Sequence, residues 1–184
     1  MLKLTAVIVI LACAVSALGQ KTDGVSVMKV SAETRDSVVF QMSVKKAMYG
    51  ADENIDVRYQ VHNKSRKTIH LVTKDYDPTT IPDSWIAVLR EPIDSPDAHT
   101  PYTYKMIKIG PGKTYTGKRT VDAKTLNDHP RYSFNVTEIQ VGFAYVFDIK
   151  DLDECSYSLP CLRKVYDEAR IVTLGNLVVA RKVE

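Results

Sequence analysis

Apolar and polar residues alternate along most of this chain with a repeat of two. Between Ile55 and Val61 every second residue is apolar, and the residues between them carry charged or amide side chains. A repeat of two puts successive side chains on opposite faces of an extended strand, whereas a helix repeats every 3.6 residues. The segments that we predict to be strands are 38–44, 55–61, 69–71, 85–89, 104–109, 114–121, 134–147, 171–174 and 177–183.

The prolines and one short segment complete the predicted fold. All eight prolines fall between the predicted strands, as expected because proline has no amide proton to donate within a sheet. Residues 162–169 instead carry apolar side chains at helical spacing, with Pro160 close to their start. Many short strands separated by turns predict an all-β fold, an Ig-like antiparallel β-sandwich with one short helix near the C-terminus.

Two connections and one glycine carry specific predictions. The polar turn 63–67 separates two alternating segments and predicts a hairpin. Its expected cross-strand pairs are Val61 with Ile69 and Tyr59 with Leu71. Gly175-Asn176, between two apolar runs, is typical of a two-residue hairpin turn, and one strand that contains a glycine is the alternative. Gly142 predicts a bulge or a close backbone approach.

The N-terminal segment has the pattern of a secretory signal. A lysine precedes the apolar run Leu4–Val15, and small residues follow at the expected cleavage site. This run is shorter than the roughly twenty residues that span a membrane as a helix. We expect residues 1–19 to be removed and residues 20–184 to form a single Ig-like β-sandwich domain, periplasmic or secreted. In the alternative, Cys13 becomes a lipidated N-terminus that anchors the domain.

Cysteines and charges narrow the class of protein. After the signal, Cys155 and Cys161 are the two cysteines, and in an oxidising compartment we expect them to form a disulfide. The chain has 25 basic and 22 acidic residues, which are interspersed apart from basic clusters at 64–67 and 181–182. A nucleic-acid-binding face concentrates basic residues and interleaves aromatic ones, so we expect no nucleic-acid partner.

The motifs of common enzymes, such as Gly-x-Ser-x-Gly and His-Glu-x-x-His, do not occur in the sequence. We therefore expect no catalytic site and no cofactor. The predicted hairpin places His62 and His70 on one solvent-facing side, but zinc needs three or four ligands, so we expect no metal site there. Four acidic residues offer oxygen ligands for Ca²⁺, with a solvated loop as the favoured alternative. These are Asp148, Asp151, Asp153 and Glu154.

Two segments match the acceptor sequence for N-linked glycans, which matters only in a eukaryotic host. Asn63-Lys64-Ser65 lies in a predicted turn, where a glycan fits. Asn135-Val136-Thr137 lies within a predicted strand, where a glycan would be awkward.

The long connection 90–104 is the candidate binding surface. Loops of this length without regular structure are often functional, and three prolines lower the entropy that this loop loses on binding. We predict that a partner contacts Pro92, Ile93, Tyr102 and Tyr104. The alternative is a solvated insert that covers a sheet edge.

Several segments resemble those of one bacterial family. Residues 49–57 and 61–65 are similar to its Gly-Glu turn, alternating strand and Asn-x-Ser turn. A strand that contains Trp85 and the turn 109–113 follow in the same order. This order resembles the BsuPI-type proteinase-inhibitor domain over roughly residues 38–146. The long connection and the cysteine loop depart from that pattern. The resemblance implies an Ig-like sandwich and proteinase inhibition.

These observations lead to one expected function and one alternative. We expect a secreted or periplasmic, noncatalytic β-sandwich binding module whose partner is an extracytoplasmic protein. Proteinase inhibition, with a protease as that partner, is its most specific form. The alternative is an extracytoplasmic protein that binds a metal or small ligand, or a hydrolase without a recognisable motif.

Overall fold

Two β-sheets pack face to face. The structure, a computed structural model, describes residues 28–74, 79–80, 86–89, 104–124, 136–147 and 159–182. All neighbouring strands of the first sheet are antiparallel. Its order is β1 (Met28–Glu33), β2 (Val38–Val44), β4 (Ile55–Asn63) and β9 (Thr114–Val121).

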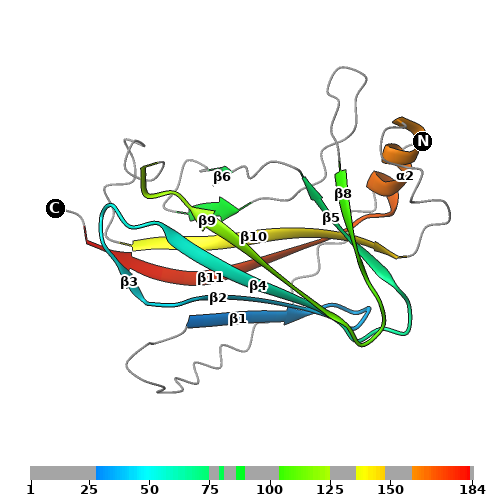
Figure 1. Ribbon diagram of the computed structural model, residues 1–184, viewed down its shortest axis with the longest axis horizontal. Coiled ribbons are helices and arrows are strands. Elements are labelled where there is room, and N and C mark those ends of the chain that lie inside the picture. Colours follow the sequence, from blue (N-terminus) through cyan, green and yellow to red (C-terminus); the bar gives the residue numbers. More distant parts are fainter. Residues whose placement is uncertain are drawn as a thin grey trace.

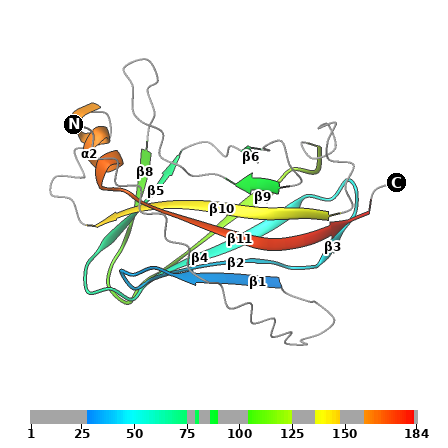
Figure 2. The ribbon, with the colours of Figure 1, turned by 180° about the vertical axis from the view of Figure 1, so that it is seen from behind.

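The second sheet is built around two long neighbouring strands, β10 and β11. Its order is β3 (Met48–Tyr49), β11 (Arg170–Arg181), β10 (Val136–Phe147), β5 (Ile69–Lys74) and β8 (Tyr104–Ile109), with β7 (Ile86–Leu89) beside β10 and β6 (Thr79–Thr80) beside β7. The β3–β11 and β7–β10 pairs are parallel. Figure 1 shows β4 and β9 in front of β10 and β11, and Figure 2 shows the opposite side. The predicted all-β sandwich is confirmed.

Aromatic side chains from both sheets fill the core between them. The Phe40 ring of β2 lies 5.0 Å from that of Phe143 and 5.7 Å from that of Tyr145, both on β10. The Tyr59 ring of β4 lies 5.2 Å from Phe143. Aromatic pairs at such separations contribute about 0.5–1.5 kcal/mol beyond the burial of their area. This cluster holds β10 against β2 and β4.

The predicted hairpin at 63–67 is wrong, because β4 and β5 lie in different sheets. β4 pairs with β9, and β5 pairs with β8. The four strands form one two-stranded ribbon that bends from the first sheet into the second at residues 63–68 and 110–113. Val61 and Ile69 are both buried on either side of the bend. The alternation of apolar residues therefore continues through the bend and does not reveal the change of sheet.

The predicted hairpin at Gly175-Asn176 is also wrong, and the alternative of one strand is confirmed. β11 runs through both residues and pairs with β10 on each side of them. The register shifts between Ile139 and Val141 of β10, where two residues of β11 face one residue of β10. This is a β-bulge. Gly142 has a regular partner, so the bulge is not at the predicted position.

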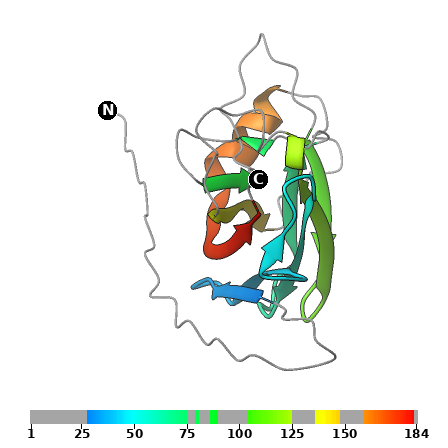
Figure 3. The same cartoon turned by 90° about the vertical axis from the view of Figure 1, so that its left-hand side faces the viewer.

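Helix α2 (Leu159–Glu168) covers part of the second sheet. It begins three residues before the predicted segment and has Pro160 in its first turn. On the side of the sheet that faces away from the first sheet, Val72, Ala144 and Val146 are nevertheless buried, and so is Val165 of the helix. Figure 3 shows α2 on that side. The second sheet thus has apolar contacts on both faces.

Gly117→Ala tests the packing between β4 and β9. Tyr59 lies opposite Gly117, and a Cβ at Gly117 would stand 2.2 Å from Cζ of the Tyr59 ring. Since this ring is buried in the core, we expect the free energy of unfolding in urea to fall by roughly 1–3 kcal/mol. In a Tyr59→Leu background the same change should be neutral or stabilising, because alanine suits a strand better than glycine. An equal loss in both backgrounds would contradict the contact.

Candidate functional site

Three turns meet at one end of the sandwich. They connect β1 to β2 at residues 34–37, β4 to β5 at residues 63–68 and β8 to β9 at residues 110–113. Figure 1 shows all three at its lower right. Loops gathered at one end of a β-sandwich are a common place for binding sites.

Backbone hydrogen bonds join the three turns. The N–H of Lys64 donates to the carbonyl of Ser37 over 2.9 Å, which links the first turn to the second. The N–H of Gly112 donates to the carbonyl of Asn63 over 2.7 Å, and the N–H of Asn63 donates to the carbonyl of Lys113 over 3.0 Å. The turns therefore hold fixed positions relative to one another.

Two of these turns depend on a residue in the left-handed region. Ser37 has a φ of 61°, and its N–H donates to the carbonyl of Thr34 over 3.0 Å. Gly112 has a φ of 68° and follows Pro111, while the N–H of Lys113 donates to the carbonyl of Gly110 over 3.1 Å. Proline followed by a glycine with a positive φ is common in type II turns. This turn is the Ile-Gly-Pro-Gly-Lys element that stands out in the sequence.

Asn63 fixes the bend of the ribbon. Its side chain is fully buried, and its Nδ2 donates to the carbonyls of Lys67 over 2.8 Å and Ile109 over 2.9 Å. Its Oδ1 accepts from the N–H of Ser65 over 3.0 Å and from the Ser65 hydroxyl over 2.6 Å. Because the Asn63 side chain is fully buried and donates both amide hydrogens inside the protein, the folded chain does not present it at the surface to a glycan.

Tyr145 ties the first turn to the second sheet. Its buried hydroxyl donates to Oδ2 of Asp36 over 2.9 Å and lies 3.3 Å from Oγ1 of Thr34. Asp36 also forms an ion pair with Arg170 at the start of β11. Burial raises the pKa of Tyr145 to about 12, and the charge of Asp36 acts in the same direction.

Phe147 lies between two cations at the end of β10. The Cζ of Arg170 is 4.9 Å from the centre of its ring, and the Nζ of Lys67 is 5.7 Å from it. Cations at these distances are attracted to the ring by its quadrupole. The ring of Tyr145 also meets it edge-on, with 6.1 Å between centres. Phe147 thus places two positive charges beside the three turns.

Basic residues outnumber acidic ones at this end of the molecule. It carries six basic residues and two acidic ones, which leaves a net charge of +4. We call it the basic end and define it as residues 33–37, 62–68, 110–114, Phe147 and Arg170. Both carboxylates there are already paired, Glu33 with Nζ of Lys64 at 2.9 Å and Asp36 with Arg170.

Three cations of the basic end, one on each turn, have neither an acidic partner nor an aromatic ring as partner among the residues that the structure describes. Arg35, Arg66 and Lys113 stand on three different turns. All three side chains are exposed to solvent. Both carboxylates of the basic end are engaged by other cations, so none within the described ranges is paired with these three charges.

The surplus of positive charge extends over the whole described framework. Its residues include twenty basic and nine acidic side chains, a net charge of +11, while the full chain has a net charge of +3. The other thirteen acidic residues lie outside the described ranges. The near balance of charge in the full sequence therefore does not hold for the described residues alone.

Most of the site residues predicted from the sequence lie outside the described ranges. Pro92, Ile93, Tyr102 and Cys155 lie there, and so do the signal segment 1–19 with Cys13, the acidic residues of 148–154, and Asn135. Tyr104 begins β8 and Cys161 lies in α2, but the side chains of both are outside the description. The disulfide and the binding loop therefore stay predictions.

The two histidines do not lie together as predicted. His62 is on the first sheet, where its Nδ1 is 2.8 Å from Oγ1 of Thr114 in a hydrogen bond. His70 is on the second sheet, paired across from Lys108, and only 5% of it is exposed. The error follows from the hairpin that does not form. Within the described ranges, His, Cys, Asp and Glu side chains form no cluster of three or more that fits a metal ion.

The grouping of cations at the basic end was not predicted from the sequence. Arg35, Arg66 and Lys113 are far apart in the chain, and the bend of the ribbon brings their turns together. The cluster at 64–67 was the available signal, but by itself it reads as a polar turn. The sequence did not predict a role for Phe147 or Arg170, because Phe147 ends β10 and Arg170 begins β11 without any distinctive pattern.

Comparisons with known proteins give no family for this chain. No protein-family model matches it, and no curated protein matches it either. One similar solved structure is a β-glucosidase from Listeria innocua in complex with isofagomine. It is 9% identical with a TM-score of 0.25, and the match covers 89% of this chain and 17% of that chain. The chain thus spans less than a fifth of that protein, and so low a TM-score supports no inference. Among the described helical residues, none form a helix long and apolar enough to span a membrane.

Asn63→Asp tests the role of the buried amide. The carboxylate keeps the acceptor atoms but cannot donate to the carbonyls of Lys67 and Ile109. We expect a loss of roughly 2–5 kcal/mol in the free energy of unfolding at pH 7, because two buried acceptors lose their donors beside a buried charge. The loss should shrink as the pH falls toward 4, since burial raises the carboxyl pKa and protonation removes that charge. Arg66→Ala, a neighbouring exposed site, should change stability by less than about 0.5 kcal/mol. A pH-independent loss would contradict this account.

Tyr145→Phe tests the link between the first turn and the second sheet. At pH 7 the variant should lose about 1.5–3 kcal/mol of unfolding free energy with the hydrogen bond to Asp36. Tyr145 has a pKa of about 12 when folded and about 10 when unfolded, so the unfolded chain loses its proton first as the pH rises. Wild-type stability therefore falls between pH 10 and 12, by about 1.4 kcal/mol at pH 11. The difference in urea midpoint between wild type and variant should therefore be smaller at pH 11 than at pH 7. An unchanged gap would rule out a raised pKa at this site.

Proposed function

We propose that this chain is a noncatalytic binding module that works outside the cytoplasm, and that a protein binds to its basic end. The observation that carries this proposal is the set of Arg35, Arg66 and Lys113. These cations stand on three turns joined by backbone hydrogen bonds and have no acidic partner within the described ranges. The extracytoplasmic location rests on the signal pattern of residues 1–19.

The rigidity of the basic end supports a role in binding. The backbones of all three turns are fixed by hydrogen bonds, and Asn63 locks the bend between two of them. A surface that is already ordered loses little conformational entropy when a partner binds. Structure of this kind favours a recognition surface over a hinge.

The composition of the basic end favours a protein partner. Arginine and aromatic residues are enriched where proteins contact one another. Here Arg35 and Arg66 are exposed on two of the turns, and Lys67 and Arg170 lie over the ring of Phe147. Both carboxylates of this end already serve as structural partners of Lys64 and Arg170. They support the turns rather than provide a base for catalysis.

Proteinase inhibition is the most specific form of this proposal. It rests on the resemblance to the BsuPI-type domain, carried by the Gly-Glu turn near residue 50 and the turn at 109–113. Residues 20–184 should then lower the activity of at least one serine, cysteine or metalloprotease in a dose-dependent manner. Unchanged activity across all three classes removes this form and leaves the binding module.

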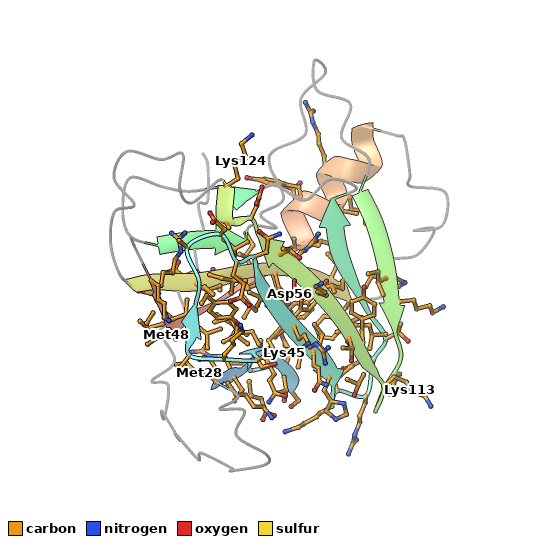
Figure 4. The ribbon with its side chains drawn as sticks, turned by 60° about the vertical axis from the view of Figure 1, so that its left-hand side comes forward. Met28, Lys45, Met48, Asp56, Lys113 and Lys124 are labelled. Carbon is orange, nitrogen blue, oxygen red and sulfur yellow. The ribbon has the colours of Figure 1, made fainter. Side chains whose placement is uncertain are left out.

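Affinity capture with matched variants tests the binding surface. The bait is residues 20–184, incubated with the extracytoplasmic fraction of the source organism and analysed by mass spectrometry. The first variant, Arg35→Ala with Arg66→Ala and Lys113→Ala, should lose the captured protein. The control is Lys45→Ala with Arg58→Ala and Lys124→Ala, which removes the same charge elsewhere. Figure 4 shows Lys124 and Lys113 at opposite ends of β9.

A third variant separates the two candidate surfaces. It changes Pro92, Ile93, Tyr102 and Tyr104 to alanine. Loss of the captured protein in this variant alone would assign binding to the long connection and reject the basic end. Retention of the protein by all three variants would reject both surfaces. Equal urea midpoints for bait and variants show that any loss reflects binding and not unfolding.

A further inference from the structure

We propose that the basic end recognises an extended acidic segment of its protein partner, in which several Asp or Glu side chains contact Arg35, Arg66 and Lys113. This inference rests on the proposed function and specifies the chemistry of the partner. Three features of the basic end support it. Seven of its backbone N–H groups are hydrogen-bonded within the protein, its cations stand on three different turns, and its described residues form no large exposed apolar surface.

Backbone amides of the basic end are used within the protein. Sites that bind phosphate commonly present several free backbone N–H groups to the anion. Here seven N–H groups are donated to oxygens of the same end. They belong to Ser37, Asn63, Lys64, Ser65, Lys67, Gly112 and Lys113. At these seven positions an anion can be recognised by side chains alone, and this does not favour a phosphate cradle.

The available cations match several negative groups and not one small anion. Arg35, Arg66 and Lys113 each come from a different turn, and each turn leads into different strands. A chain of acidic residues presents carboxylates at regular intervals, so it can contact all three at once. Two of the three cations are arginines, whose planar guanidinium groups bind carboxylates through paired hydrogen bonds.

A lipid surface fits the basic end less well. Surfaces that bind bilayers combine cations with apolar side chains that enter the membrane. Phe147 is partly buried, and cations lie over its ring. Of the exposed large apolar residues that the structure describes, Ile171 is the one next in sequence to a residue of the basic end. Charge alone would hold a bilayer here.

Fluorescence anisotropy with a labelled oligoglutamate peptide tests this inference. The three proteins are residues 20–184, the Arg35/Arg66/Lys113 alanine variant and the Lys45/Arg58/Lys124 control variant. We expect the first variant to bind the peptide about tenfold more weakly, and the control to change the affinity much less. Binding should also weaken between low salt and about 0.15 M salt. An oligoglutamine peptide of equal length should not bind.

Four outcomes would overturn the inference. The first two are an equal loss of peptide affinity in both variants, which would mean that net charge alone attracts the peptide, and equal affinity for the oligoglutamine peptide. The other two are tighter binding to vesicles that contain anionic lipid than to the peptide, and displacement of the peptide by millimolar inorganic phosphate whose own binding is lost in the Arg35/Arg66/Lys113 variant. If the capture experiment loses its protein in the first variant while the peptide does not discriminate, the proposed function stands and this inference fails.

Discussion

The hydrogen bonds of Asn63 at the bend of the ribbon are the constraint on which the rest of this structure depends. Where β4 leaves the first sheet and β5 enters the second, backbone groups lose their regular partners. The buried amide supplies two donors to the carbonyls of Lys67 and Ile109 and an acceptor to Ser65. Buried polar groups without partners are costly, so a residue with both kinds of atom is needed there. The same bend brings the turn at 110–113 beside the turn at 63–68.

The packing of the aromatic core also positions residues of β10 at the basic end. Phe40 and Tyr59 of the first sheet pack on Phe143 of the second, so β10 is held against the first sheet. Tyr145 follows two residues later and reaches the first turn through Asp36. Since side chains on one face of a strand repeat every second residue, Phe147 then emerges at the edge of the core. The position of the two cations around Phe147 is thus a consequence of core packing.

The sequence predicted the strands better than their partners. Segments 38–44, 104–109 and 114–121 match β2, β8 and β9, because alternation depends only on one face being buried. The hairpin at 63–67 was wrong for the same reason, since Val61 and Ile69 are buried whether their strands pair or belong to opposite sheets. β1 was missed although its apolar and polar residues alternate, and its apolar side chains are only partly covered. The basic end was beyond reach, because Arg35, Arg66 and Lys113 meet only through the bend.

Basic residues predominate in the described framework and acidic residues predominate outside it, so the two nearly cancel in the charge of the whole chain. Strands need residues that suit a pleated, half-buried surface, and lysine or arginine can lay an apolar stem along such a surface while the charge stays in water. Aspartate and glutamate have shorter stems, and most acidic residues of this chain lie outside the described ranges. The described framework is therefore basic even though the total charge of the chain is small. At the basic end the two described carboxylates pair with Lys64 and Arg170, so within the described ranges the cations of the three turns give this end its net positive charge.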